Sequence, residues 1–161
     1  MAFDLLSRRF LLTALLVTLC SVGLVACAGQ QKVPKAQPMP AGKNFTGVWY
    51  SPQFEHMHLR QTGDKVSGIF TYEEGGTIEG EVDGNLLVFK WIEPGSKEKA
   101  KRTMKGRGYL QLVQDGEMTK LKGEWGYNEQ ATGGGPWTAE WVRELEPEDP
   151  LTLEDLEAQR D

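Results

Sequence analysis

The stretch VSGIF, residues Val66–Phe70, places apolar residues at every second position on either side of a glycine. The same pattern returns as IEGEV at Ile78–Val82 and as LKGEW at Leu121–Trp125. A period of two is typical of a β-strand with one buried face. The glycine falls on the buried side, where it makes room for a bulky neighbour or permits the sharp bend that a closed barrel needs.

Turn sequences separate these stretches at Thr62–Lys65, Glu74–Gly76, Asp83–Asn85 and Asp115–Glu117. Their Gly, Asp and Asn residues adopt the positive φ angles that tight hairpins require. We predict eight strands, at residues 46–51, 55–61, 65–73, 77–83, 85–93, 103–113, 118–126 and 136–144. No helical pattern interrupts them, so the sequence predicts an all-β, eight-stranded, up-and-down antiparallel barrel, which leaves no sheet edge unpaired. A strongly bent open meander or a sandwich is the alternative.

The alternation assigns one set of side chains to the inside of the barrel. This set comprises Trp49, Met57, Leu59, Val66, Phe70, Tyr72, Ile78, Val82, Leu87, Phe89, Trp91, Leu112, Leu121, Trp125 and Trp137. The tryptophans have two interpretations, because eight-stranded barrels are either filled by side chains or hold one small ligand. They fill the core, or they line an aromatic pocket at the barrel mouth.

The first 26 residues have the composition of a signal peptide. Arg8 and Arg9 precede an apolar run, Phe10–Val25, that is short for a membrane-spanning helix. An uncleaved N-terminal anchor is the alternative. The stretch Ser7–Leu12 also resembles a twin-arginine export signal, and the choice between that route and general secretion stays open.

The residues that follow, Leu24–Cys27 (LVAC), resemble the lipobox of bacterial lipoproteins. The resemblance implies cleavage after Ala26, diacylglycerol on the Cys27 sulfur and acylation of its amino group. Each buried methylene of such chains contributes about 0.8 kcal/mol to membrane binding. Cys20 leaves with the signal peptide. Ala28 stands where an Asp retains enterobacterial lipoproteins in the inner membrane, which implies an outer-membrane lipoprotein facing the periplasm.

Three further regions follow the signal peptide. Residues 27–44 comprise the lipidated cysteine and a Pro-rich segment that we expect to be a flexible tether, residues 45–145 form the barrel, and residues 146–161 form an acidic tail. Thr152 and Asp155 have the spacing of a capping box, which favours a short helix that carries Leu153 and Leu156 on one face. A frayed, solvated tail is the alternative.

The charge balance excludes one class of partner. The chain carries a net charge of −5, and removal of the signal peptide makes it more negative. Such a balance argues against binding to nucleic acids. Nothing in the sequence indicates a cofactor.

The barrel region resembles the avidin and streptavidin group of the calycins, through GVWYS at Gly47–Ser51, VSGIF, and ATGGGPWTAEW at Ala131–Trp141. The resemblance implies a meander barrel. It does not extend to biotin binding, because Ser51 replaces the family's ureido-binding Asn and Phe70 replaces a Tyr hydroxyl. Trp91, Trp125 and Trp137 match the family's stacking tryptophans in type. The candidate pocket residues are therefore Trp49, Ser51, Phe70, Trp91, Trp125 and Trp137.

His56 and His58 lie two residues apart on one face of a predicted strand, an arrangement that suits two metal ligands. Since Met57 and Leu59 occupy the inward positions, both histidines point outward with Arg60, and we expect them to lie on a solvated wall. No third ligand is evident, so no metal site is predicted. The sequence also lacks a nucleophile elbow, a Cys/His pair and a phosphate-binding loop.

Two surfaces are candidates for contact with partners. The first is the basic stretch around Lys97, Lys99, Lys101 and Arg102, which suits acidic headgroups, a glycan or the chain's own acidic tail. The second is the outward side of the fifth predicted strand, with the residues Leu86, Val88 and Ile92. It lies under Leu153 and Leu156, or it contacts a partner.

These observations lead to a functional expectation. The sequence indicates an envelope lipoprotein that acts as a non-enzymatic binding or scaffold module, for a protein partner or for a small ligand at the barrel mouth. The alternative is a small hydrolase-type or metal-binding enzyme of the periplasm that uses surface carboxylates with His56 and His58.

Overall fold

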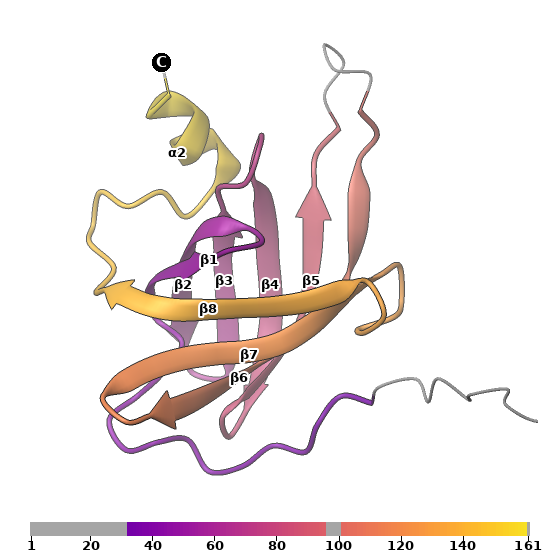
Figure 1. Cartoon of the computed structure of the whole chain (residues 1–161). Helices are drawn as coiled ribbons and strands as arrows, with labels where there is room; N and C mark the ends of the chain where they lie inside the picture. The colour runs from indigo at the N-terminus through magenta and orange to yellow at the C-terminus, as the bar shows by residue number, and fades with distance from the viewer. Residues whose placement is uncertain (1–31, 96–100, 161) are drawn as a thin grey trace, which may run out of the picture.

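The structure is a computed structural model that describes residues 32–95 and 101–160. Its elements are β1 (Gly47–Ser51), β2 (Glu55–Thr62), β3 (Lys65–Phe70), β4 (Gly76–Asp83), β5 (Leu86–Glu93), β6 (Met104–Asp115), β7 (Met118–Tyr127), β8 (Gly135–Arg143) and the helix α2 (Leu153–Ala158). Each strand pairs antiparallel with the next, and β1 pairs with β8 to close the barrel (Figure 1). The predicted up-and-down barrel is thus confirmed. The signal peptide, Cys27, Lys97 and Lys99 lie outside the described residues.

The predicted inward side chains form one core. Trp49, Met57, Leu59, Ile78, Leu87 and Trp137 are fully buried, and Phe45, just before β1, joins them. Tyr72 is the exception, because β3 ends at Phe70 and Tyr72 is 37% exposed. Its predicted inward position is wrong because the alternation stops at the end of β3 and Tyr72 belongs to the following turn, in which Glu73 and Gly75 have positive φ angles and the Gly75 N–H donates to the Tyr72 carbonyl oxygen.

Glycines on the inward side let the strands approach closely. A Cβ atom on Gly68 would lie 1.9 Å from the backbone oxygen of His58, and one on Gly123 would lie 1.7 Å from that of Tyr109. No side chain fits at such a distance, so these two positions of the repeated pattern require glycine. The pattern that predicts the strands therefore also permits the coiling by which they close.

The predicted tether is partly docked on the barrel. The Gln37 backbone N–H donates to Asn85 Oδ1 at 2.9 Å, and the Asn85 N–H donates to the Gln37 carbonyl oxygen at 2.8 Å. Met39 packs against the core from the same end. The expectation of a free tether up to residue 44 therefore needs correction, because the sequence did not reveal that the turn residue Asn85 holds this segment.

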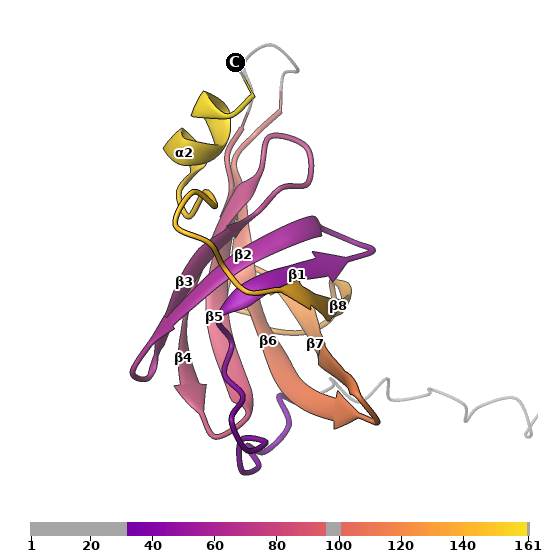
Figure 2. The same cartoon turned by 90° about the vertical axis from the view of Figure 1, so that its left-hand side faces the viewer.

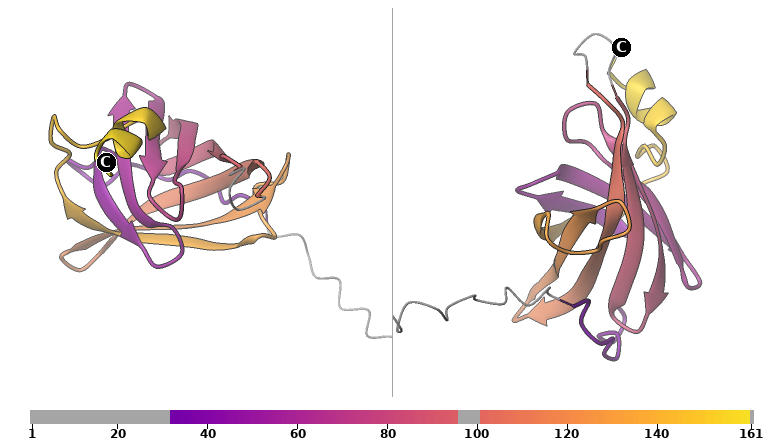
Figure 3. Two further views of the ribbon diagram at one scale, coloured as in Figure 1. Left: turned by 90° about the horizontal axis from the view of Figure 1, so that it is seen from above. Right: turned by 90° about the vertical axis from the view of Figure 1, so that its right-hand side faces the viewer.

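The C-terminal segment, residues 144–160, returns along the outside of the barrel and ends in α2 (Figure 1). The predicted capping box is present, since Thr152 accepts a hydrogen bond from the Asp155 backbone and the Asp155 carboxylate accepts one from the Thr152 backbone. Leu156 is buried over the turn that contains Gly75. Seen from above, α2 lies over the strands of the first half of the barrel (Figure 3). The helix is thus confirmed.

Candidate functional site

The six candidate pocket residues come together, but inside a filled core. Trp49, Ser51 and Trp137 are fully buried, Phe70 and Trp91 nearly so, and Trp125 is half-buried at the edge of the core. The ring of Phe54 lies 3.9 Å from that of Trp137 and edge-on to those of Phe70 and Trp125. Phe54 lies between two strands and was not among the expected interior residues.

Four residues of this cluster, Trp49, Ser51, Trp91 and Trp137, hydrogen-bond through their polar side-chain atoms within the chain. Trp49 Nε1 donates to the Phe45 carbonyl oxygen at 3.0 Å, Trp137 Nε1 to Met57 Sδ at 2.9 Å, and Trp91 Nε1 is shared between two backbone carbonyl oxygens. Ser51 Oγ accepts hydrogen bonds from the backbone N–H groups of Gln53 and Phe54. These groups therefore serve packing and turn geometry rather than ligand recognition.

His56 and His58 both point away from the core, as predicted, but His58 is not on a solvated wall. It is only 8% exposed, because the C-terminal segment covers it, and its Nδ1 donates to the Pro150 carbonyl oxygen at 3.0 Å. Burial lowers the pKa of His58, against the opposing effects of this hydrogen bond and of Asp149. Within the described ranges, no group of three His, Cys, Asp or Glu side chains is placed to hold a metal ion.

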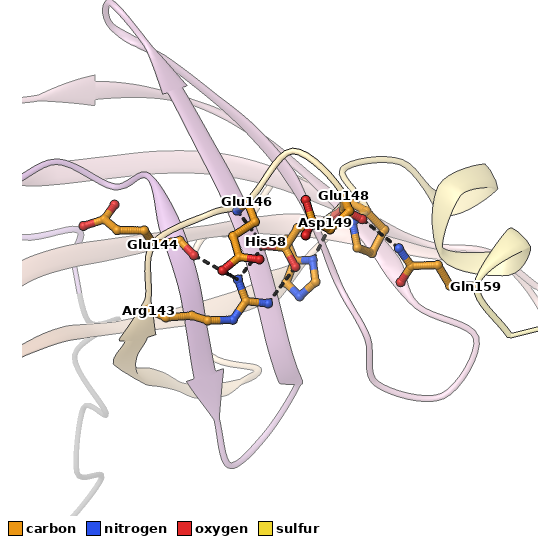
Figure 4. Close-up of polar contacts among 8 residues, drawn as sticks. His58, Arg143, Glu144, Glu146, Glu148, Asp149 and Gln159 are labelled. Atoms are coloured by element: carbon orange, nitrogen blue, oxygen red, sulfur yellow. Dashed lines mark hydrogen bonds and ion pairs between the residues drawn. The ribbon is translucent and has the colours of Figure 1, made fainter.

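Figure 4 shows the polar contacts that hold the C-terminal segment beside His58. Arg143, at the end of β8, makes two hydrogen bonds of 2.7 Å to the Asp149 carboxylate, which also accepts from the Glu146 backbone N–H. The Arg143 guanidinium lowers the pKa of Asp149 to about 2. Such a two-pronged ion pair fixes geometry as well as charge. Gln159 then ties α2 to the Glu148 carbonyl oxygen.

The outward residues of β5 have different surroundings. Leu86 is buried, whereas Val88 is 36% and Ile92 is 45% exposed. Leu153 and Leu156 lie against Gly75 instead of over β5. The expectation that they cover this strand is therefore wrong for Val88 and Ile92, and the alternative, contact with a partner, stays a prediction.

Lys101 and Arg102 are the described residues of the basic stretch, and the ion pairs of Lys101 are with nearby acids of the barrel. Lys101 pairs with Glu73 and Glu93, which links the β5–β6 connection to the β3–β4 turn and raises the pKa of Lys101. Arg102 is exposed. The acids that Lys101 contacts belong to the barrel and not to the acidic tail.

The structure also has a hollow that the sequence did not indicate. A groove of about 620 Å³ runs over the outside of the barrel. Its lining comprises Pro34, Tyr50, Pro52, Tyr109, Gln111, Lys120, Leu121, Lys122, Gly123, Thr138, Ala139 and Glu140. We name the surface that these lining residues form on the outside of β1 and β6–β8 the open wall. In Figure 2, β7 and β8 lie on the opposite side of the barrel from β3 and β4. Tyr50 is 47% exposed, and partial burial raises the pKa of Tyr109.

No family model, curated protein or solved structure matches the chain. The closed eight-stranded meander has the topology that the resemblance to the calycins implied. In the part of the chain that the structure covers, no helix has the length and apolar character needed to span a bilayer.

Proposed function

We propose that the chain is a lipid-anchored protein of the bacterial envelope, on the outer membrane facing the periplasm, and that its barrel is a non-enzymatic module that binds a protein partner through its outer surface. The anchor rests on the apolar run and the LVAC sequence at Leu24–Cys27. The binding mode rests on one observation, namely that the chain's own side chains fill the barrel interior.

Both ends of the barrel are filled in the same manner. Phe54 stacks on Trp137 towards one end, and Met39 packs against the core from the tether at the other. A small ligand at the mouth would have to displace Phe54 and break a close aromatic contact. The outer surface therefore offers binding at a lower free-energy cost.

The outward side of β5 is the candidate surface for the protein partner. Val88 and Ile92 alternate with the exposed Lys90, and Lys105 lies opposite Ile92 on β6. A partner that presents apolar groups together with carboxylates is complementary to this strip. The enzyme alternative gains no support here, because His58 is engaged by Pro150 and has no nearby pair of ligands among the described residues.

The anchor is tested by metabolic labelling with a clickable palmitate analogue in cells that produce the full chain. We expect the wild-type protein to incorporate the label and the Cys27→Ser variant to lose it and to keep its signal peptide. Cys20→Ser is the matched control, and we expect it to be labelled normally. A processed, membrane-bound Cys27→Ser protein would contradict the proposal.

The partner surface is tested by photo-crosslinking in intact cells. A photoreactive amino acid replaces Ile92 in one variant and Met118, which is the first residue of β7 and is 52% exposed, in the other. We expect a discrete crosslinked species from position 92 only, lost when Val88→Asp is added. Equal crosslinking from both positions, or none from position 92, would argue against binding at β5.

A further inference from the structure

The docked tether determines on which side the chain leaves the barrel. Pro34 lines the groove of the open wall, and the Gln111 side chain on β6 donates to the Lys35 carbonyl oxygen at 3.4 Å. Two residues further along the tether, Gln37 is held by Asn85. The first described residues therefore lie beside the open wall, as Figure 2 shows.

Docking also shortens the reach of the anchor. Cys27 precedes Lys32 by only five residues, and five extended residues span at most about 18 Å. If the whole segment up to residue 44 were free, the span would be roughly 60 Å. A lipid on Cys27 therefore keeps the bilayer surface close to the side on which Pro34 lies.

The side chains on that side suit the headgroup layer of a bilayer. Tyr50 and Tyr109 each offer a ring with a hydroxyl group, and tyrosine is enriched at membrane–water interfaces. Lys122 on β7 and Lys35 on the tether are exposed cations, which anionic lipids attract. Val33 is 36% exposed, and Glu140, the exposed acid of the groove, lies 3.5 Å from Lys120.

We propose that the open wall lies against the headgroup layer of the bilayer that holds the lipid anchor. This inference rests on the proposed function, because it needs the lipid on Cys27. It also gives the barrel an orientation, in which β3 and β4 face away from the membrane and β5, the candidate surface for the protein partner, lies to the side of the open wall.

The test places one thiol on each side of the barrel in the full, lipidated chain. Lys122→Cys lies on the open wall and Lys90→Cys on β5, and both are lysine replacements at exposed mid-strand positions. Lipidation blocks the Cys27 sulfur and cleavage removes Cys20, so a fluorophore labels only the new thiol. Each protein is reconstituted into vesicles of phosphatidylcholine and phosphatidylglycerol that contain a lipid with a spin-labelled headgroup, and the loss of fluorescence is measured.

We expect several-fold stronger quenching at position 122 than at position 90. Equal quenching, or stronger quenching at position 90, in protein that floats with the vesicles would overturn the inference and leave the anchor intact. Protein that does not float with the vesicles would overturn the anchor and this inference together. Circular dichroism of both variants before labelling verifies that the barrel is folded.

Discussion

Strand β1 carries both kinds of outer surface that this barrel has. Val48 is 2% exposed, whereas Tyr50, two residues later on the same outward side, is 47% exposed. Val48 lies opposite His58 on β2, and His58 lies opposite Ile69 on β3, which is fully buried although it points outward. We name this strip, which lies along the C-terminal segment, the covered wall.

The two walls differ in whether another segment of the chain shields the side chains that point outward. On the covered wall, a segment from the far end of the sequence shields them and is fixed by the pairs Arg143–Asp149 and His58–Pro150. On the open wall, tyrosines and lysines line a groove that no segment of the described chain fills. The covered wall thus contributes to stability, and the open wall is available for contact with other molecules.

The largest expected effect comes from changes that disturb both walls alike. Gly68→Ala and Gly123→Ala each force a Cβ atom against a backbone oxygen, so we expect each to lower the free energy of unfolding by about 3 kcal/mol or more. Urea denaturation measures this. Ser67→Ala, next to Gly68 but exposed, is the control and should change stability by less than about 0.5 kcal/mol. A loss below 1 kcal/mol at either glycine would show that the strands can separate without cost.

Removal of the cover should affect only the covered wall. A chain that ends at Leu145 exposes Val48 and Ile69 and leaves Arg143 without Asp149, and we expect a loss of about 2–4 kcal/mol in the free energy of unfolding. Thermal and urea unfolding measure it, with the exposed substitution Glu157→Ala as control. Unchanged stability would mean that the segment does not shield this strip.

The sequence predicted the barrel because strand alternation and turn residues are local signals. The sequence did not predict the covered wall. Alternation shows which residues point outward, but it does not show which of these are covered by another segment of the chain. His58 meets Pro150 across 92 residues of sequence, and Asn85 holds Gln37 across 48. Such contacts depend on where distant segments return, which no local pattern specifies.

Only part of the candidate site was predicted, again because local patterns do not specify contacts between distant segments. The interior tryptophans were identified from their positions in the strands, yet whether they enclose a ligand depended on Phe54, which lies in a turn and closes the cluster. The groove on the open wall arises from the coiling of four strands and from Pro34 of the tether. No motif in the sequence marks that combination.

A smaller effect should follow from pH at the covered wall. Because the folded pKa of His58 is lowered, the unfolded state binds a proton more readily, and stability falls as the pH drops below about 6.5. The pKa of Asp149, about 2, adds a second loss as the pH falls through its unfolded value near 3.8. Hydrogen exchange of residues 144–160 between pH 7 and 5 reports the first loss.

The matched variant for this experiment is His58→Asn. Its side-chain N–H takes the place of the Nδ1 donor to Pro150 but does not titrate, so the faster exchange of the C-terminal segment at pH 5 should disappear. His56→Asn is the control and should retain the pH dependence. Exchange that accelerates equally in the His58→Asn protein would assign the effect to another group.

The smallest effect on stability is expected on the open wall. Tyr50→Ser removes an exposed ring that contacts the His56 ring edge-on, with 5.4 Å between the two centroids. Because the ring is exposed, the free energy of unfolding should change by less than about 0.5 kcal/mol. In the lipidated Lys122→Cys protein, the same substitution should weaken quenching by the spin-labelled headgroups, because it removes an interfacial side chain. A loss of more than 1 kcal/mol with unchanged quenching would place Tyr50 among the residues that hold the barrel together, and the two walls would then differ only in what covers them.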